Sequence, residues 1–76
     1  MFKEGNAVDK LRFGSNVRLY RKSMGYTQAK LGARVGTSGA YIYELEKGNA
    51  EPKVFLAYRI ASKLGVTVEQ LIGDGA

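Results

Sequence analysis

The sequence predicts an all-α protein, a compact single domain of five short helices. Five stretches with the apolar spacing of a helix are each followed by a glycine, the residue that most often ends a helix, at Gly25, Gly36, Gly48, Gly65 and Gly73. Signals for β-strands are weak throughout. A chain of 76 residues forms only one hydrophobic core, so we expect residues 1–76 to make one domain with flexible ends at 1–7 and 73–76.

The first helix is predicted by apolar side chains that recur at intervals of four, three and four residues, at Phe13, Val17, Tyr20 and Met24. Asn6 and Asp9 signal its start, and it reaches about Ser23.

Two further helices follow with a very short connection between them. Thr27 is expected to cap the second helix, and Thr37 or Ser38 the third, which ends at Gly48. Only Gly36 and Thr37 separate the two helices, which favours a sharp corner and gives helix-turn-helix spacing.

The last two helices are predicted from their start signals. Pro52 suits the first turn of a fourth helix. Its buried face is expected to hold Val54, Ala57, Ile60, Ala61 and Leu64. Thr67, with Gln70 three residues later, predicts a capping box at the start of a fifth helix, anchored by Leu71 and Ile72.

A helical projection divides the third helix into two faces. Ile42, Leu45 and Glu46 share the inward face. The outward face combines a small residue, an aromatic hydroxyl, a carboxylate and a cation, with one tyrosine on the flank: Ala40, Tyr43, Glu44, Lys47 and Tyr41. Such a face is either a binding surface or an ordinary solvated one.

The inward carboxylate of Glu46 needs a partner, because burying an isolated charge is very unfavourable. Arg21 and Arg18 on the first helix are the candidates, and the alternative is an exposed carboxylate near a helix end. The small residues Gly39 and Ala40 would let backbone amides and the positive helix end approach a phosphate or a base edge, unless they are simply undemanding positions.

Composition narrows the function classes. The chain has no Cys and no His, which excludes disulfides, Cys or His nucleophile chemistry and Cys/His zinc sites. No stretch approaches the ~20 apolar residues that span a bilayer, and the N-terminal sequence lacks an apolar signal-peptide centre, so we expect a cytoplasmic protein.

The net charge of +5 favours a polyanionic partner, and the charge is unevenly distributed. Residues 1–43 hold eight basic and two acidic residues, +6, whereas residues 44–76 hold four basic and five acidic ones, −1. The first half is therefore the candidate anion-facing half, with a solvated basic surface as the alternative.

Several linked segments resemble a known family. They are Phe13-Gly14-x-x-Val17-Arg18-x-x-Arg21, Gly25-x-Thr27-Gln28-x-x-Leu31, Gly36-x-Ser38-x-x-Tyr41-Ile42-x-x-Leu45-Glu46-x-Gly48, Pro52, and Ile60-Ala61-x-x-Leu64-Gly65-Val66-Thr67-x-x-x-Leu71. With these gaps, residues 13–72 resemble the Cro/phage-repressor type of helix-turn-helix, the XRE family. The resemblance implies a lambda-repressor-like domain whose third helix, about 38–47, lies in the major groove, usually as a homodimer on a pseudo-palindromic operator.

The resemblance also implies roles for individual residues. Gln28 opens the second helix where the family contacts a phosphate, and Arg21 with Glu46 fills the place of the family's ion pair between the first and third helices. The start and outer face of the recognition helix hold Ser38, Gly39, Ala40, Tyr41, Tyr43 and Glu44. The residues at the loop that often grips the opposite backbone are Lys47, Asn49 and Lys53.

The sequence departs from the family pattern at three places. Gly32 replaces the usual Ala in the second helix, which costs about 0.5–1 kcal/mol of helix stability unless close packing compensates. Lys30 stands where an acidic residue is common. Gly39 and Ala40 lack the long polar side chains that often contact bases, so direct base readout is expected to be thin.

The remaining base contacts are chemically definite. Ala40 suits a thymine methyl group, and Glu44 suits a cytosine amino group, although Glu44 may equally be a surface carboxylate paired with Lys47. Tyr41 and Tyr43 can donate their hydroxyls to phosphate or base. Salt-sensitive backbone contacts are expected from Lys22, Gln28, Lys30, Arg34, Tyr41 and Lys47.

We therefore expect a sequence-specific regulator that binds double-stranded DNA, in a prokaryotic cell or encoded by a phage, with no cofactor and no metal. Its homodimer surface is expected on the fourth and fifth helices, at Phe55, Leu56, Tyr58, Val66, Val68 and Ile72, with core packing as the alternative for about half of them. A protein-interaction adaptor with the same fold, antitoxin-like or a coactivator, is the alternative function. An enzyme is not expected, because the chain has no Walker motif, no G-x-G-x-x-G, no metal-ligand cluster and no nucleophile-base pair.

Overall fold

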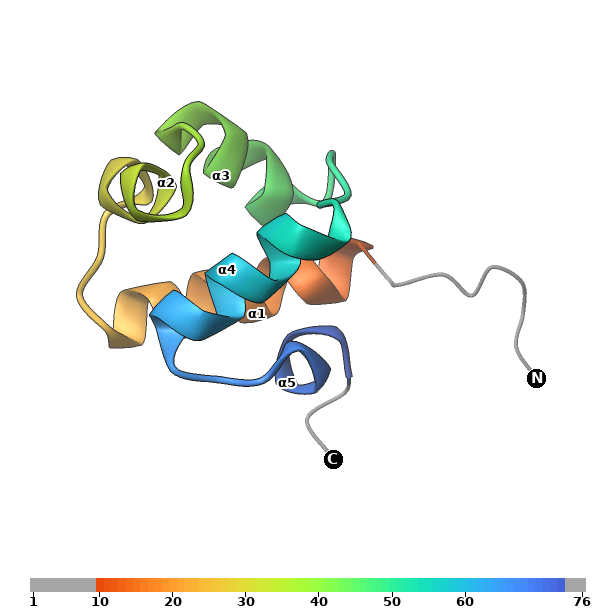
Figure 1. Cartoon of the computed structure of the whole chain (residues 1–76). Helices are drawn as coiled ribbons and strands as arrows, with labels where there is room; N and C mark the ends of the chain where they lie inside the picture. The colour runs from red at the N-terminus through yellow and green to blue at the C-terminus, as the bar shows by residue number, and fades with distance from the viewer. Residues whose placement is uncertain (1–9, 74–76) are drawn as a thin grey trace.

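Residues 10–73 are described by the computed structural model, and within that range the chain forms five α-helices and no β-strand. The helices are α1 (Lys10–Ser23), α2 (Gln28–Val35), α3 (Gly39–Lys47), α4 (Val54–Leu64) and α5 (Val68–Ile72), as drawn in Figure 1. The prediction of an all-α fold with five helices is confirmed. The start signal at Asn6 and Asp9 and the ends predicted to be flexible, apart from Gly73, lie outside the described residues.

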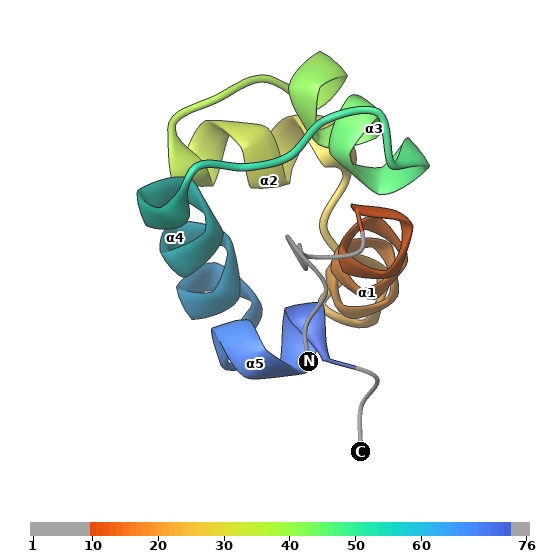
Figure 2. The same ribbon diagram turned by 90° about the vertical axis from the view of Figure 1, so that its right-hand side faces the viewer.

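The helices surround one hydrophobic core. In Figure 2, α1 and α4 lie on opposite sides, α2 and α3 close the top, and α5 closes the bottom. Every helix contributes to the buried apolar side chains, which are Phe13, Val17, Leu31, Val35, Ile42, Leu45, Ala57, Ile60, Ala61, Leu64 and Leu71. Full burial of a side chain the size of Leu, Ile or Phe contributes about 1.5–3 kcal/mol, so this core is what holds the short helices together.

Side-chain caps begin three of the helices. The Thr27 hydroxyl accepts from the Lys30 N–H at 3.0 Å, and the Ser38 hydroxyl accepts from the Tyr41 N–H at 3.1 Å. Of the two capping residues considered for the third helix, Ser38 is thus the one used. Thr67 caps α5 and forms the predicted capping box with Gln70, the third residue of that helix.

Glycines end the first four helices in the left-handed conformation, with φ between 72° and 85°. At each of these ends the N–H of the residue after the glycine bonds back to a carbonyl in the last turn, the arrangement known as the Schellman motif. Gly73 also caps its helix, as predicted, but its backbone is extended, with φ −81° and ψ −176°. The short α5 ends with the Gly73 N–H donating to Glu69 O at 2.8 Å.

Three side chains lie outside their predicted positions. Pro52 precedes the N-cap, Lys53, and α4 begins only at Val54, because Lys53 is still extended at ψ 160°. Val54 was expected in the buried face but is 63% exposed, since the first residue of α4 lies beyond the edge of the core. Met24 lies after the end of α1 and is likewise exposed, whereas Tyr20 packs partly against the core.

Two helical glycines allow backbones to approach closely. A Cβ added at Gly14 would overlap the Leu45 carbonyl oxygen, so α1 and α3 meet backbone to backbone at this point. A Cβ added at Gly32 would lie 2.5 Å from the carbonyl carbon of Ser38. Close packing of α2 against the start of α3 therefore explains the departure at Gly32, and it fixes the corner between the two helices.

Candidate nucleic-acid interface

The two faces of α3 are separated as the helical projection predicts. Ile42 and Leu45 are completely buried, whereas Ala40, Tyr43, Glu44 and Lys47 are exposed. Tyr41 is half-buried on the flank and packs against the core. The inward side chains hold α3 on the domain, and the outward ones are left without a packing role.

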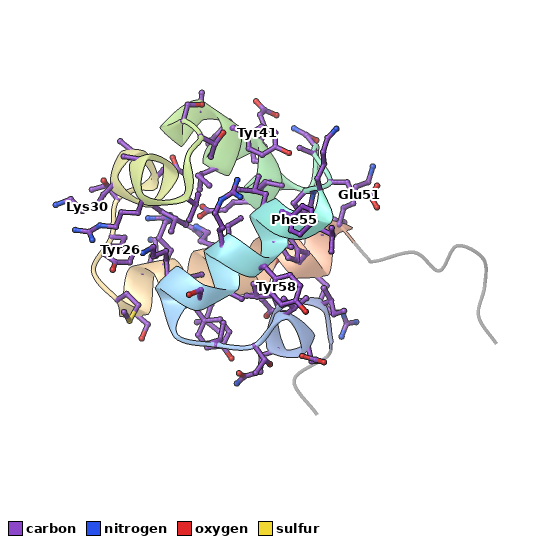
Figure 3. The ribbon with its side chains drawn as sticks, viewed as in Figure 1. Tyr26, Lys30, Tyr41, Glu51, Phe55 and Tyr58 are labelled. Carbon is purple, nitrogen blue, oxygen red and sulfur yellow. The ribbon has the colours of Figure 1, made fainter. Side chains whose placement is uncertain are left out.

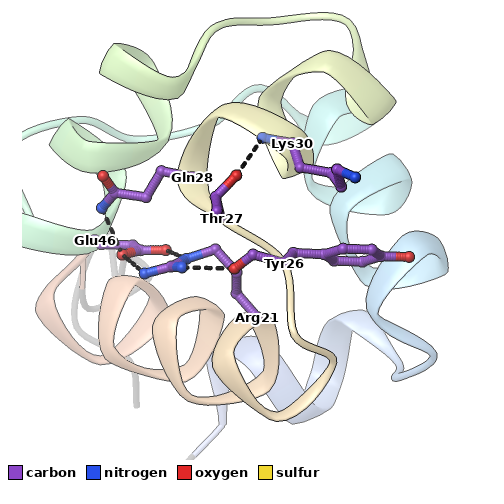
Figure 4. Close-up of polar contacts among 6 residues, drawn as sticks. All are labelled: Arg21, Tyr26, Thr27, Gln28, Lys30 and Glu46. Carbon is purple, nitrogen blue, oxygen red and sulfur yellow. Dashed lines mark hydrogen bonds and ion pairs between the residues drawn. The ribbon is translucent and has the colours of Figure 1, made fainter.

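The inward carboxylate of Glu46 forms a bidentate ion pair with Arg21 of α1. Arg21 Nε lies 2.6 Å from Glu46 Oε2, and Arg21 Nη2 donates to Glu46 Oε1 at 3.0 Å (Figure 4). The two side chains are only 8% and 3% exposed. Arg21, not Arg18, is thus the partner of Glu46, and the exposed-carboxylate alternative does not hold.

This ion pair also ties α2 into the same network. Gln28 Nε2 donates to Glu46 Oε1 at 3.0 Å, and Arg21 Nη1 donates to the Tyr26 carbonyl oxygen at 2.8 Å (Figure 4). Hydrogen bonds that saturate a buried ion pair offset much of the desolvation penalty of its charges. The network therefore sets how α1, α2 and α3 are oriented relative to one another.

A groove of about 680 Å³ lies over this network, between the three helices. Its lining contains four cationic side chains together with polar and aromatic ones: Arg18, Arg21, Lys22, Lys47, Thr27, Gln28, Tyr43 and Glu46. Because Arg21 is neutralised by Glu46, the groove has three exposed cations, which favours an anion.

Arg18 was not among the residues expected to contact DNA. It lies four residues before Lys22 and therefore on the same face of α1. That spacing is the signal that would have identified it. The groove also contains Gln28, Tyr43 and Lys47, so it brings together some of the residues that were predicted from the sequence to contact DNA.

The exposed end of α3 carries two side-chain pairs. Lys47 Nζ lies 5.4 Å from the centroid of the Tyr43 ring, a cation–π contact on the groove side. Glu44 Oε1 accepts from Asn49 Nδ2 at 2.9 Å. Glu44 is therefore paired with Asn49 and not with Lys47, the alternative named from the sequence.

Gly39 and Ala40 differ in what they face. A Cβ at Gly39 would lie 2.9 Å from the Ala29 Cα, so this glycine permits α3 to pack on α2. The Ala40 methyl group is exposed on the outward face. Gly39 is therefore used for helix packing, and Ala40 offers a methyl group to solvent.

The remaining predicted contact residues lie outside the groove. Lys30 and Arg34 are exposed on α2, with the Arg34 guanidinium 5.3 Å from the Tyr26 ring centroid. Figure 3 places Lys30 and Tyr26 at one end of the molecule and Glu51 at the other. Lys53 is exposed at the N-cap of α4, in the connection from α3.

A second exposed surface lies on α4. Val54, Phe55 and Tyr58 are 63%, 73% and 62% exposed, and Figure 3 shows Phe55 and Tyr58 pointing away from the helix bundle. Val54 and Tyr58 line a hollow of about 450 Å³ between α4 and α5, and Val54 also lines a neighbouring one of about 280 Å³. The other residues expected there pack partly against the core, which is what the core-packing alternative anticipated: Leu56, Val66, Val68 and Ile72.

In residues 10–73 no helix is long and apolar enough to cross a membrane, and no three acidic side chains are grouped as a metal site would require.

A buried corner between α2 and α3, with the outer face of α3 exposed beside a cationic groove, defines a helix-turn-helix domain. The family profile described as Helix-turn-helix matches residues 17–71. The chain belongs to this family, in its XRE type.

Individual relatives agree with the family. An uncharacterised HTH-type transcriptional regulator from Methanothermobacter thermautotrophicus is 47% identical over 49 residues, 64% of this chain and 71% of the relative. The uncharacterised HTH-type transcriptional regulator y4dJ from Sinorhizobium fredii is 39% identical over 59 residues, 78% and 77% of the two chains. The P22 c2 repressor protein, solved with synthetic operator 9T, is similar with a TM-score of 0.79 and 28% identity, over 84% of this chain and 96% of that one.

Proposed function

We propose that this chain is a transcriptional regulator that binds double-stranded DNA with α3 in the major groove. The observation that carries the proposal is the division of α3, whose inner side chains are fixed by the core and the Arg21–Glu46 pair while Ala40, Tyr43 and Glu44 remain exposed. A rigid helix with an unoccupied outer face is what insertion into the groove requires. The proposed function is binding and includes no catalytic step, and its setting is the cytoplasm of a prokaryotic cell.

The cationic groove is proposed to hold the DNA backbone beside α3. Arg18 and Lys22 approach from α1, and Lys47 from the end of α3. Gln28 donates one amide hydrogen to Glu46, and within residues 10–73 its second amide hydrogen and its carbonyl oxygen have no partner, so it can also contact a phosphate. Lys30, Arg34, Asn49 and Lys53 lie further out and would add long-range attraction or contacts with the flanking backbone.

Base contacts are proposed for Ala40, Tyr43 and Glu44. The exposed methyl group of Ala40 suits the C5-methyl of thymine, and the Glu44 carboxylate suits the amino group of cytosine. The backbone amides at Ser38 and Gly39, at the positive end of α3, suit a phosphate.

The operator-bound form is proposed to be a homodimer. The large rings of Phe55 and Tyr58 are 73% and 62% exposed, and Tyr58 lines the hollow between α4 and α5. In a two-fold arrangement each copy supplies both the projecting ring and the hollow.

The same exposed rings support the second candidate, a protein-interaction adaptor. Phe55 and Tyr58 would then bind a different protein, and the α3 face would not select a base sequence. This alternative predicts that the chain binds all DNA sequences with similar affinity, and that substitutions on α3 do not change this.

The test is selection of bound duplexes from a random pool at about physiological salt. The wild-type chain is compared with Tyr43→Ala/Glu44→Ala and with Lys63→Ala, a matched loss of an exposed side chain on α4. We expect a two-fold symmetric site with the wild type and Lys63→Ala, relaxed at matching positions in both halves by the α3 variant. Weak, salt-sensitive retention without an enriched site would refute DNA reading and favour the adaptor.

A further inference from the structure

A hydrogen bond between two side chains, Asn49 and Glu44, spans the turn that ends α3. Gly48 is left-handed, and the Asn49 N–H donates to the Glu44 carbonyl oxygen at 2.9 Å. This Schellman turn brings residue 49 back beside residue 44, where the two side chains are usually apolar and in contact. Here they are an amide and a carboxylate, joined by the 2.9 Å bond from Asn49 Nδ2 to Glu44 Oε1.

The corresponding turn at the end of α4 shows the ordinary case. Val66 bonds back to the Ala61 carbonyl, and both side chains are apolar and at least partly buried. A polar pair in the exposed turn of α3 contributes little to folding, because an exposed hydrogen bond competes with water. The pair therefore needs an explanation other than stability.

Among residues 10–73, no cation forms an ion pair with the Glu44 carboxylate. The neighbouring Lys47 turns toward the Tyr43 ring, and in residues 10–73 the Asn49 bond is the one hydrogen bond that Glu44 accepts through its side chain. A free carboxylate in the major groove is repelled by the phosphates. It becomes favourable there when it accepts a hydrogen bond from an exocyclic amino group.

We propose that Asn49 is a positioning residue that sets the base preference of the domain through Glu44. The bond to Oε1 fixes a side chain with three rotatable bonds, and it leaves Oε2 for the amino group of cytosine. Ordering Glu44 before binding removes part of the entropy loss on binding. This inference rests on the proposed DNA-binding function, and it gives Asn49 a role other than gripping a phosphate.

The two roles of Asn49 predict different results. Loss of a phosphate contact weakens binding to every sequence by a similar factor. Loss of a positioning contact changes the preference at the one base pair that Glu44 faces. The effect must also disappear when Glu44 is absent, because Asn49 then has nothing to position.

The experiment first selects a site for the wild-type chain from random duplexes and identifies the base pair whose preference Glu44→Ala removes. Affinities for that site and for its three variants at this pair are then measured for wild type, Asn49→Ala, Asn49→Asp, Glu44→Ala and Glu44→Ala/Asn49→Ala. Lys53→Gln, from the same connection, serves as the control for a lost backbone contact.

We expect the wild type to prefer a cytosine-containing pair by about tenfold. Asn49→Ala should reduce this preference to about threefold, and Asn49→Asp should abolish it because the new carboxylate repels Glu44. In the Glu44→Ala background the change at residue 49 should add nothing. Lys53→Gln should weaken all four duplexes equally.

An Asn49→Ala variant that keeps the full preference, or that weakens binding to all four duplexes by a similar factor, would overturn the positioning role while leaving DNA binding intact. A wild-type chain that enriches no site would overturn the proposed function and this inference together. Thermal unfolding of each variant confirms that the folded domain is compared.

Discussion

Replacement of Gly14 by alanine tests the backbone contact between α1 and α3. An alanine in a helix interior is normally more favourable than glycine by about 0.8–1.0 kcal/mol. At this site the new Cβ would overlap the Leu45 carbonyl oxygen and would lie 2.9 Å from the Glu46 Cα. Both atoms belong to a helix backbone held by the core, so neither can rotate away.

The balance of these effects gives the expected magnitude. Overpacking of a core contact costs about 1–3 kcal/mol, and occasionally more where only backbone can move. Because only backbone can move at Gly14, the cost lies in the upper part of this range, about 2–3 kcal/mol. Subtracting the gain in helix propensity of about 1 kcal/mol, we expect Gly14→Ala to lower the free energy of unfolding by about 1–2 kcal/mol. For a domain of this length, that lowers the Tm by roughly 4–16 °C.

The assay is urea and thermal unfolding followed by circular dichroism, with Ser15→Ala as the matched control. Ser15 is the next residue of α1 and is exposed, so its replacement should change the free energy of unfolding by no more than about 0.5 kcal/mol. A Gly14→Ala domain as stable as the wild type, or more stable, would refute the close approach of α1 and α3.

Three further predictions follow from the same geometry. Glu46→Ala should lower the free energy of unfolding by about 3–5 kcal/mol, because it leaves the Arg21 guanidinium buried without its partner. The double variant Arg21→Met/Glu46→Met should recover part of this loss. A double variant that recovers none of it would contradict this account of the ion pair. In a salt titration of DNA binding, Arg18→Ala should reduce the slope of log affinity against log salt concentration by about 0.9 in magnitude, which corresponds to one phosphate contact. An unchanged slope would show that Arg18 does not contact the DNA backbone. Phe55→Ser should convert the dimer to a monomer in analytical ultracentrifugation. It should not lower the free energy of unfolding of the monomer, because the Phe55 ring is 73% exposed. A variant that still forms the dimer would place the interface elsewhere.

The features predicted correctly from the sequence are those decided by a few neighbouring residues. Thr27 and Thr67 cap helices because a hydroxyl at that position reaches an N–H three residues on. The inward position of Glu46 follows from the period of the helix, and the burial of its charge then requires a cation. Choosing Arg21 over Arg18 from the residues alone was not possible, since both lie on α1 within one turn.

The features missed depend on distant backbone or on loop geometry. The role of Gly14 requires knowing that α3 crosses α1 at Leu45 and Glu46, more than thirty residues away in the sequence. Asn49 was expected to face DNA backbone, and its bond to Glu44 depends on how the Gly48 turn directs the chain. Pro52 was predicted in the first turn of the fourth helix but lies just before its N-cap, because proline is equally compatible with the extended segment that precedes an N-cap.

The division of α3 into a fixed side and a free side has a consequence for how this domain can diversify. Ala40, Tyr43 and Glu44 contribute little to the core, so substitutions there should be tolerated by the fold whatever they do to binding. The residues that stabilise the fold and the residues proposed to contact bases are thus different residues of one nine-residue helix. Gene duplication could therefore yield regulators with new targets on an unchanged framework, and a designer could exchange the same three side chains without rebuilding the domain.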